Sequence, residues 1–111
     1  MARRRSRTRG GFTIPRRFTL AGHTIEVRVL GDTDWPHSRK AIGAWDAQNL
    51  RIDVLLCAEP SITEQVFLHE VLHAILSVLS QDRLNRREPL INSVSHLLRQ
   101  ALTSGVGSHK I

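Results

Sequence analysis

This chain of 111 residues has a single cysteine, no long apolar stretch and no acidic residue near its N-terminus. Cys57 is the only cysteine, so no disulfide can form within the chain. Any metal site must therefore be built from histidine and carboxylate side chains. Cys57 itself is expected to be a small buried residue rather than a nucleophile.

No apolar run approaches the roughly 18 to 20 residues that a membrane-spanning helix needs. The basic N-terminus is not followed by the apolar core of a signal peptide, so a cytoplasmic location and no membrane partner are expected. A chain of this length and ordinary apolar content can bury one hydrophobic core. The expectation is one small domain over residues 14–103, with a polar C-terminal tail over residues 104–111.

Acidic residues are absent from the first 17 positions, which contain seven arginines. Since the whole chain has a formal charge of +6, the remaining residues carry a net charge of −1, from nine basic and ten acidic groups. Residues 1–13 are expected to form a basic, disordered tail. Such a tail can bind nucleic-acid phosphates without sequence preference, or it can be a solubilising extension, and the sequence leaves both interpretations open.

Two β-hairpins are predicted in the first half of the domain. Residues 17–20 and 23–30 flank Ala21-Gly22, and the second segment alternates apolar and polar side chains. Residues 40–45 and 50–56 flank a polar turn over residues 46–49. With the helices that follow, these segments predict an α+β fold: a small antiparallel sheet of about four strands, with one face covered by a helix.

Two helices are predicted in the second half of the chain. Ser61 and Glu64 have the S-x-x-E spacing of a capping box, so the first helix is expected to begin at Ser61. Asn85 and Glu88 have a similar spacing, and an apolar stripe continues to about Thr103, so a second helix is expected to begin near Asn85. The short connection between the two helices makes them an antiparallel pair.

The first of these helices contains the motif H-E-x-x-H at residues 69–73. Residues four apart lie on one helix face, so His69 and His73 can converge on a single metal ion, with Glu70 beside it. Two neutral imidazoles suit Zn²⁺, and Glu70 is the candidate general base that takes a proton from water. The same polar line also fits the solvent-facing side of a largely buried helix, so the motif alone leaves two interpretations.

Three segments together resemble a known family: I-G-A-W-D-A-Q-N-L-R-I at 42–52, T-E-Q-V-F-L-H-E-V-L-H-A-I-L at 63–76, and E-P-L-I-N-S-V-S-H-L-L-R-Q at 88–100. They are similar to the small phage-type zincin metallopeptidases related to the ImmA/IrrE and SprT-like groups. The resemblance implies a minimal zincin-like fold in which the second helix supplies a third zinc ligand. It also implies that a strand, either residues 41–46 or residues 50–56, borders the cleft and pairs with an extended substrate.

The sequence leaves two candidates for the third zinc ligand, Glu88 and His96. Glu88 fits the carboxylate of the gluzincin pattern, Glu-x-x-x-Asp, although Asn92 stands where the pattern has Asp. The Asn92 carboxamide can still accept a hydrogen bond from a ligand histidine. His96 is the alternative, as in a three-histidine site of SprT-like type. The chain has no tyrosine, so His96, Arg99 or a loop residue would have to stabilise the oxyanion that such peptidases generate.

The interpretation that follows is a zinc-dependent endopeptidase acting on a protein or peptide, with Glu70 as general base and His69, His73 and Glu88 as metal ligands. The alternative is a binding module on an inactive zincin fold, which contacts a protein or nucleic acid through the arginine-rich tail.

Overall fold

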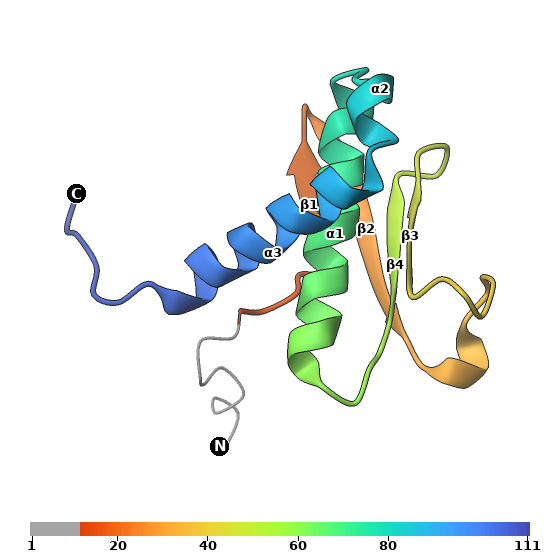
Figure 1. Ribbon diagram of the computed structural model, residues 1–111, viewed down its shortest axis with the longest axis horizontal. Coiled ribbons are helices and arrows are strands. Elements are labelled where there is room, and N and C mark those ends of the chain that lie inside the picture. The colour runs from red at the N-terminus through yellow and green to blue at the C-terminus, as the bar shows by residue number, and fades with distance from the viewer. Residues whose placement is uncertain (1–11) are drawn as a thin grey trace.

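The computed structural model describes residues 12–111, and it has an α+β fold with a four-stranded sheet and helices packed on one of its faces (Figure 1). The strands are β1 (Arg17–Leu20), β2 (His23–Leu30), β3 (Gly43–Asp46) and β4 (Arg51–Leu55). A single turn of 3-10 helix, η2 (Asp32–Asp34), follows β2. The helices are α1 (Pro60–Val78), α2 (Asp82–Asn85) and α3 (Glu88–Ser104). The predicted α+β class and the number of strands are confirmed.

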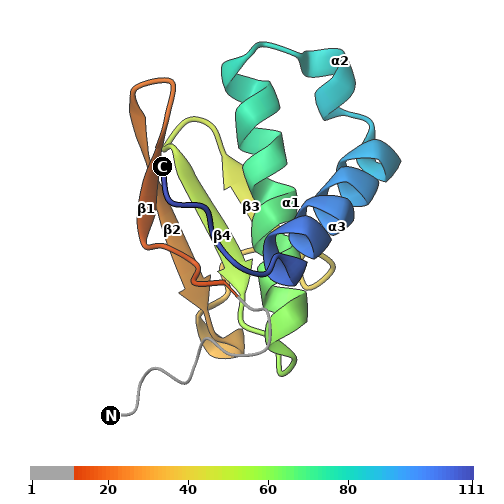
Figure 2. The ribbon, with the colours of Figure 1, turned by 90° about the vertical axis from the view of Figure 1, so that its left-hand side faces the viewer.

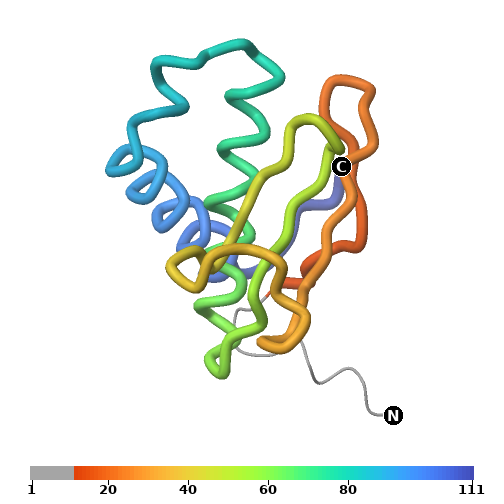
Figure 3. The backbone as a smooth tube through the Cα atoms, turned by 90° about the vertical axis from the view of Figure 1, so that its right-hand side faces the viewer, coloured from red at the N-terminus to blue at the C-terminus, as the bar shows by residue number. Residues whose placement is uncertain are grey.

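The sheet has the strand order β1-β2-β4-β3, and it is mixed rather than antiparallel. Both predicted hairpins are present, β1 with β2 and β3 with β4. The prediction of an antiparallel sheet was wrong because β2 and β4 run parallel, with Val27 opposite Ile52. After β2 the chain crosses to the far edge of the sheet to form β3, and β4 then returns between them (Figure 3). The predicted strand over residues 50–56 is therefore interior, and β3 is an edge strand, with β1 at the opposite edge.

Helix α1 packs against one face of the sheet, and the core lies between them (Figure 2). Alternate residues of the two central strands point toward this helix, which is why Ile25, Ile52 and Val54 are fully buried. Phe67 packs edge to face against Phe18, with ring centroids 6.1 Å apart. The motif helix is thus anchored to the sheet by its apolar side.

The predicted start of α1 at Ser61 was wrong by a small margin, and the capping box does not form. The helix begins at Pro60, whose fixed φ suits the first turn, and Glu59 is the N-cap residue with no side-chain hydrogen bond to the helix. Glu64 does not return to Ser61, because its carboxylate forms an ion pair with Arg99 of α3 at 2.8 Å. A tertiary contact has replaced the local one.

The predicted start of the second helix at Asn85 was also wrong. Asn85 ends the short helix α2, and α3 begins at Glu88 with Pro89 in its first turn. The end of α3 at Ser104 agrees with the prediction. Helices α1 and α3 run in opposite directions and cross obliquely (Figure 1). Gln65 of α1 donates a hydrogen bond to Ser95 at 2.6 Å, so the early part of α1 lies beside the later part of α3.

The two ends of the domain differ in how they pack. The predicted basic tail over residues 1–13 lies mostly outside the described residues, but Phe12 contacts Phe67, with ring centroids 6.3 Å apart. Residues 105–111 are exposed and belong to no helix or strand.

Cys57, predicted to be buried, is only half-buried. No helix among residues 12–111 is long and apolar enough to span a membrane.

Candidate metal centre

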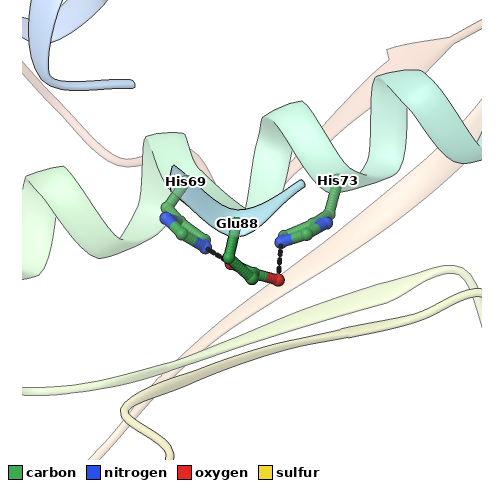
Figure 4. A group of neighbouring side chains, drawn as sticks. All are labelled: His69, His73 and Glu88. Atoms are coloured by element: carbon green, nitrogen blue, oxygen red, sulfur yellow. Dashed lines mark hydrogen bonds and ion pairs between the residues drawn. The ribbon is translucent and has the colours of Figure 1, made fainter. Parts of the chain in front are cut away.

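The two motif histidines project from one face of α1, as their spacing predicts (Figure 4). Their ring centroids are 5.0 Å apart, and the Nε2 atom of each ring faces the same point. Both side chains are largely enclosed, with exposed fractions of 20% for His69 and 14% for His73. The rings therefore present two nitrogen atoms to a shared, partly sheltered position.

Glu88 completes this group from the first turn of α3. Its carboxylate oxygens lie 3.0 Å from Nε2 of His69 and 3.0 Å from Nε2 of His73 (Figure 4). The end of α1 at Val78 and the short helix α2 turn the chain back so that the start of α3 is level with the motif. One ligand atom from each of the three residues lies within 4.8 Å of the others. The structure thus brings Glu88, and not His96, to the two histidines.

The chemistry and spacing of this group fit a zinc ion. Two imidazole nitrogens and one carboxylate oxygen form a common zinc ligand set, which leaves one position of a tetrahedron for water. With metal-to-ligand bonds of about 2.0 to 2.1 Å, neighbouring ligand atoms of a tetrahedral site lie about 3.3 Å apart. Oε1 of Glu88 lies 3.0 Å from Nε2 of His69 and Oε2 lies 3.0 Å from Nε2 of His73, and one ligand atom from each of the three residues lies within 4.8 Å of the others, so modest side-chain movements would bring a single oxygen and both nitrogens to a tetrahedral spacing.

Asn85 holds the second ring nitrogen of His73. The Nδ1 atom of His73 lies 2.6 Å from Oδ1 of Asn85, and Nδ2 of Asn85 donates a hydrogen bond to the main-chain oxygen of His73 at 3.2 Å. Since the carboxamide oxygen only accepts, Nδ1 is the donor of this hydrogen bond, so in a neutral ring Nε2 is the nitrogen with a free lone pair. The sequence assigned this orienting role to Asn92, and the structure gives it to Asn85.

Glu70 lies beside the histidines and is directed toward the sheet. It is buried, with 8% of its surface exposed. Burial raises the pKa of Glu70 to about 7, and the charge of Glu88 raises it as well, whereas His73 and His37 act to lower it. A carboxyl group with a pKa near neutrality can both accept and release a proton at physiological pH.

Gly43, at the start of the edge strand β3, makes room for this carboxyl group. A Cβ atom placed on Gly43 would lie 2.8 Å from Oε2 of Glu70 and 2.6 Å from Cγ1 of Val66. Both distances are shorter than side chains tolerate, so only glycine allows β3 to approach α1 this closely. Gly43 was not among the predicted site residues. The sequence feature that could have indicated it is a glycine inside a predicted strand, which often marks a close approach of the backbone to another group.

The group opens into a cleft of about 760 Å³ between α1, α3 and the segment that leads into β3. The cleft follows α1 from His69, His73 and Glu88 toward the first turn of the helix. Its lining residues are Lys40, Ala41, Ile42, Gly43, Ser61, Ile62, Gln65, Val66, His69, Glu70, His73, Glu88, Asn92, His96 and Arg99. A site of this volume can hold a small molecule or several residues of a peptide.

The structure places the remaining candidate residues further along the cleft. His96 is exposed on α3, two turns beyond Glu88, and is not part of the group formed by His69, His73 and Glu88. Arg99 donates hydrogen bonds to Glu64 and so is held by an ion pair. Asn92 is exposed, and its main-chain oxygen accepts a hydrogen bond from Ser95. Asn85 had been interpreted as a helix cap, which concealed its contact with His73.

Comparison with protein-family models, curated proteins and solved structures finds no match to this chain. The interpretation of the site therefore depends on its own geometry.

Proposed function

We propose that this protein is a zinc-dependent endopeptidase with a minimal zincin-like fold. The observation that carries the proposal is the convergence of His69, His73 and Glu88, whose ligand atoms lie within 4.8 Å of one another. Glu70 lies next to this group in a cleft large enough for a peptide. If the polar line of α1 were only its solvent-facing side, no carboxylate from another helix would need to contact both histidines. The convergence therefore favours a functional site.

The residues of the chain have separate roles in the proposed reaction. A zinc ion held by His69, His73 and Glu88 would polarise the scissile carbonyl and lower the pKa of the attacking water. Glu70 takes the proton from that water and then passes it to the leaving amine. Asn85 accepts a hydrogen bond from Nδ1–H of His73 and so keeps the Nε2 atom available for the metal.

The edge strand supplies the proposed contact for the substrate backbone. β3 pairs with β4 on one side only, so its other edge is free among the described residues. The residues that lead into β3, including Ala41 and Ile42, line the cleft. An extended peptide can add to such an edge by main-chain hydrogen bonds, which would place a peptide bond beside Glu70.

Zinc analysis and a peptide-cleavage assay together test the proposal. Purified wild-type protein should contain about one zinc per chain, and His69→Ala should lose it. His109→Ala is the matched control, because His109 is exposed in the C-terminal segment and distant in sequence from the site. Equal zinc in wild type and His69→Ala would contradict the metal assignment.

Glu70→Gln tests the chemistry apart from the metal. The amide has nearly the shape of the carboxyl group but cannot accept the proton, so this variant should keep its zinc and its fold while losing hydrolysis. Loss of zinc from Glu70→Gln would show that Glu70 has a different role. Hydrolysis that continues in Glu70→Gln at the wild-type rate would exclude Glu70 as the general base.

A further inference from the structure

The charges that line the cleft are separated along its length. Among its described lining residues the only acids are Glu70 and Glu88, and both belong to the metal-binding end. The cations Lys40 and Arg99 line the cleft beyond them, and His96 adds an imidazole on the same wall as Arg99. The cleft therefore changes from a metal-binding end to a cationic end.

Several contacts place these cations at the end of the cleft near the start of α1. Ile42 accepts a hydrogen bond from the amide of Leu55 at 2.9 Å, and β4 leads directly from there to α1, so Lys40 lies toward the beginning of the helix. Arg99 is bound to Glu64, one turn into α1. Lys40 belongs to the segment that leads into β3 and Arg99 belongs to α3, so the two cations come from different walls of the cleft.

The first turn of α1 contributes to the same end. Ser61 and Ile62 line the cleft there, and the amides of a helix N-terminus carry partial positive charge. Glu64 compensates part of the charge of Arg99, but it is buried and does not line the cleft. Lys40 is exposed. The charged side chains that line this end of the cleft are thus cations, and the exposed N-cap residue Glu59 adds a negative charge outside the lining.

We propose that this cationic end, formed by Lys40, Arg99 and the first turn of α1, binds a carboxylate group of the substrate. The inference builds on the proposed function by naming a substrate feature for the same cleft. Eight residues of α1 separate Ser61 from His69, or about 12 Å along the helix axis. An extended peptide advances about 3.3 Å per residue, so the carboxylate lies about four residues from the cleaved bond.

The carboxylate has two possible sources, an acidic side chain or the C-terminus of a peptide. Three labelled peptides of otherwise identical sequence distinguish them: one has glutamate and an amidated C-terminus, one has glutamine and a free C-terminal carboxylate, and one has glutamine and an amide. In each peptide the variable group lies four residues from the central bond, and a second set places the glutamate or glutamine on the other side of that bond. Dissociation constants are measured by fluorescence anisotropy with zinc-treated, full-length Glu70→Gln protein, which keeps the peptides intact.

At least one carboxylate peptide is expected to bind about two- to fivefold more tightly than the neutral peptide, as for a partly exposed charge pair. The second substitution Lys40→Glu should abolish this preference. Lys110→Glu makes the same charge change in the exposed C-terminal segment and should leave it intact. The preference should also decrease as salt is raised.

Two results would overturn the inference. One is equal or undetectable binding of all three peptides, and the other is a preference that survives Lys40→Glu, which would assign it to other basic residues of the chain. Failure of the proposed function is separate, because it is measured by zinc content and by wild-type cleavage. The two outcomes are independent, because the Lys40-dependent preference can be present or absent in a protein that binds no zinc and cleaves no peptide.

Discussion

The Nδ1 atom of His73 and the Oδ1 atom of Asn85 lie 2.6 Å apart, so a residue outside the H-E-x-x-H motif orients one of the motif histidines. This contact also explains why α3 does not begin at Asn85. The carboxamide that would cap a helix there is already bound to the side chain and main chain of His73. Asn85 therefore links the motif histidines to the turn that brings Glu88 back to them.

Asn85→Ala should weaken zinc binding by about 10- to 100-fold, because partners that orient a ligand histidine typically contribute that much. Asn85→Asp should retain most of the affinity, since a carboxylate also accepts the Nδ1 hydrogen bond. Competition with a chromophoric chelator measures both variants. Asn92→Ala is the control, and a larger loss in Asn92→Ala than in Asn85→Ala would return the orienting role to Asn92.

Glu88→Ala should lower zinc affinity by more than about 100-fold, which exceeds the loss expected from an orienting residue. His96→Ala should bind zinc like the wild type, because His96 lies about 12 Å further along the axis of α3 than Glu88. The same chelator competition separates the two. A collapse of affinity in His96→Ala with little change in Glu88→Ala would replace the carboxylate ligand with a three-histidine site.

Gly43→Ala should impair hydrolysis while zinc is retained. The added methyl group collides with Glu70 and Val66, so the variant should lose about 1 to 3 kcal/mol of stability and displace the Glu70 carboxyl group. Thermal unfolding, zinc content and peptide cleavage are measured together. Gly31→Ala is the matched control, since a Cβ atom there meets nothing within 4 Å. Full activity in Gly43→Ala would show that the contact with Glu70 has no functional role.

Asp53 should make stability depend on pH in the acid range. Burial acts to raise the pKa of the Asp53 carboxyl group, but hydrogen bonds from Arg28 and His37 and the charges of Arg28 and Arg51 outweigh it and lower the pKa below 3.8. Because the pKa is lower in the folded state, the ionised group stabilises the protein above about pH 3.8, and this contribution is lost as the pH falls through the folded-state pKa.

Asp53→Asn should accordingly reduce the free energy of unfolding at pH 7 by about 1 to 3 kcal/mol, because it weakens the hydrogen bonds of a buried group. Its stability should also decline less steeply than that of the wild type below pH 4. Urea unfolding at several pH values measures both effects. Asp34→Asn, at an exposed position, should change neither, and identical acid profiles of Asp53→Asn and the wild type would contradict the assignment.

A variant that lacks residues 2–11 separates the enzyme from the binding module. The deletion stops before Phe12, because Phe12 packs against Phe67 and its loss would damage the core. The enzyme interpretation expects zinc content and peptide cleavage to persist while affinity for non-specific nucleic acid falls. If the wild type cleaves no peptide and the folded variant loses all partner binding, the binding-module interpretation is favoured.

Local patterns in the sequence were sufficient for the features that depend on neighbouring residues. Alternating side chains and Ala21-Gly22 predicted the first hairpin with its observed bounds, and the spacing of His69 and His73 placed both rings on one helix face. The apolar stripe of α3 predicted its end. Each of these features follows from a fixed period or a tight turn, so a short window of sequence is enough.

The tertiary structure decided the features in which a local contact and a long-range contact compete for the same side chain. Glu64 pairs with Arg99 instead of capping α1, and Asn85 binds His73 instead of starting α3. The parallel pairing of β2 with β4 joins strands that are far apart in the sequence, and alternation alone does not specify a neighbour. The approach of Gly43 to Glu70 depends on that pairing, because only the assembled sheet brings its edge strand against the motif helix.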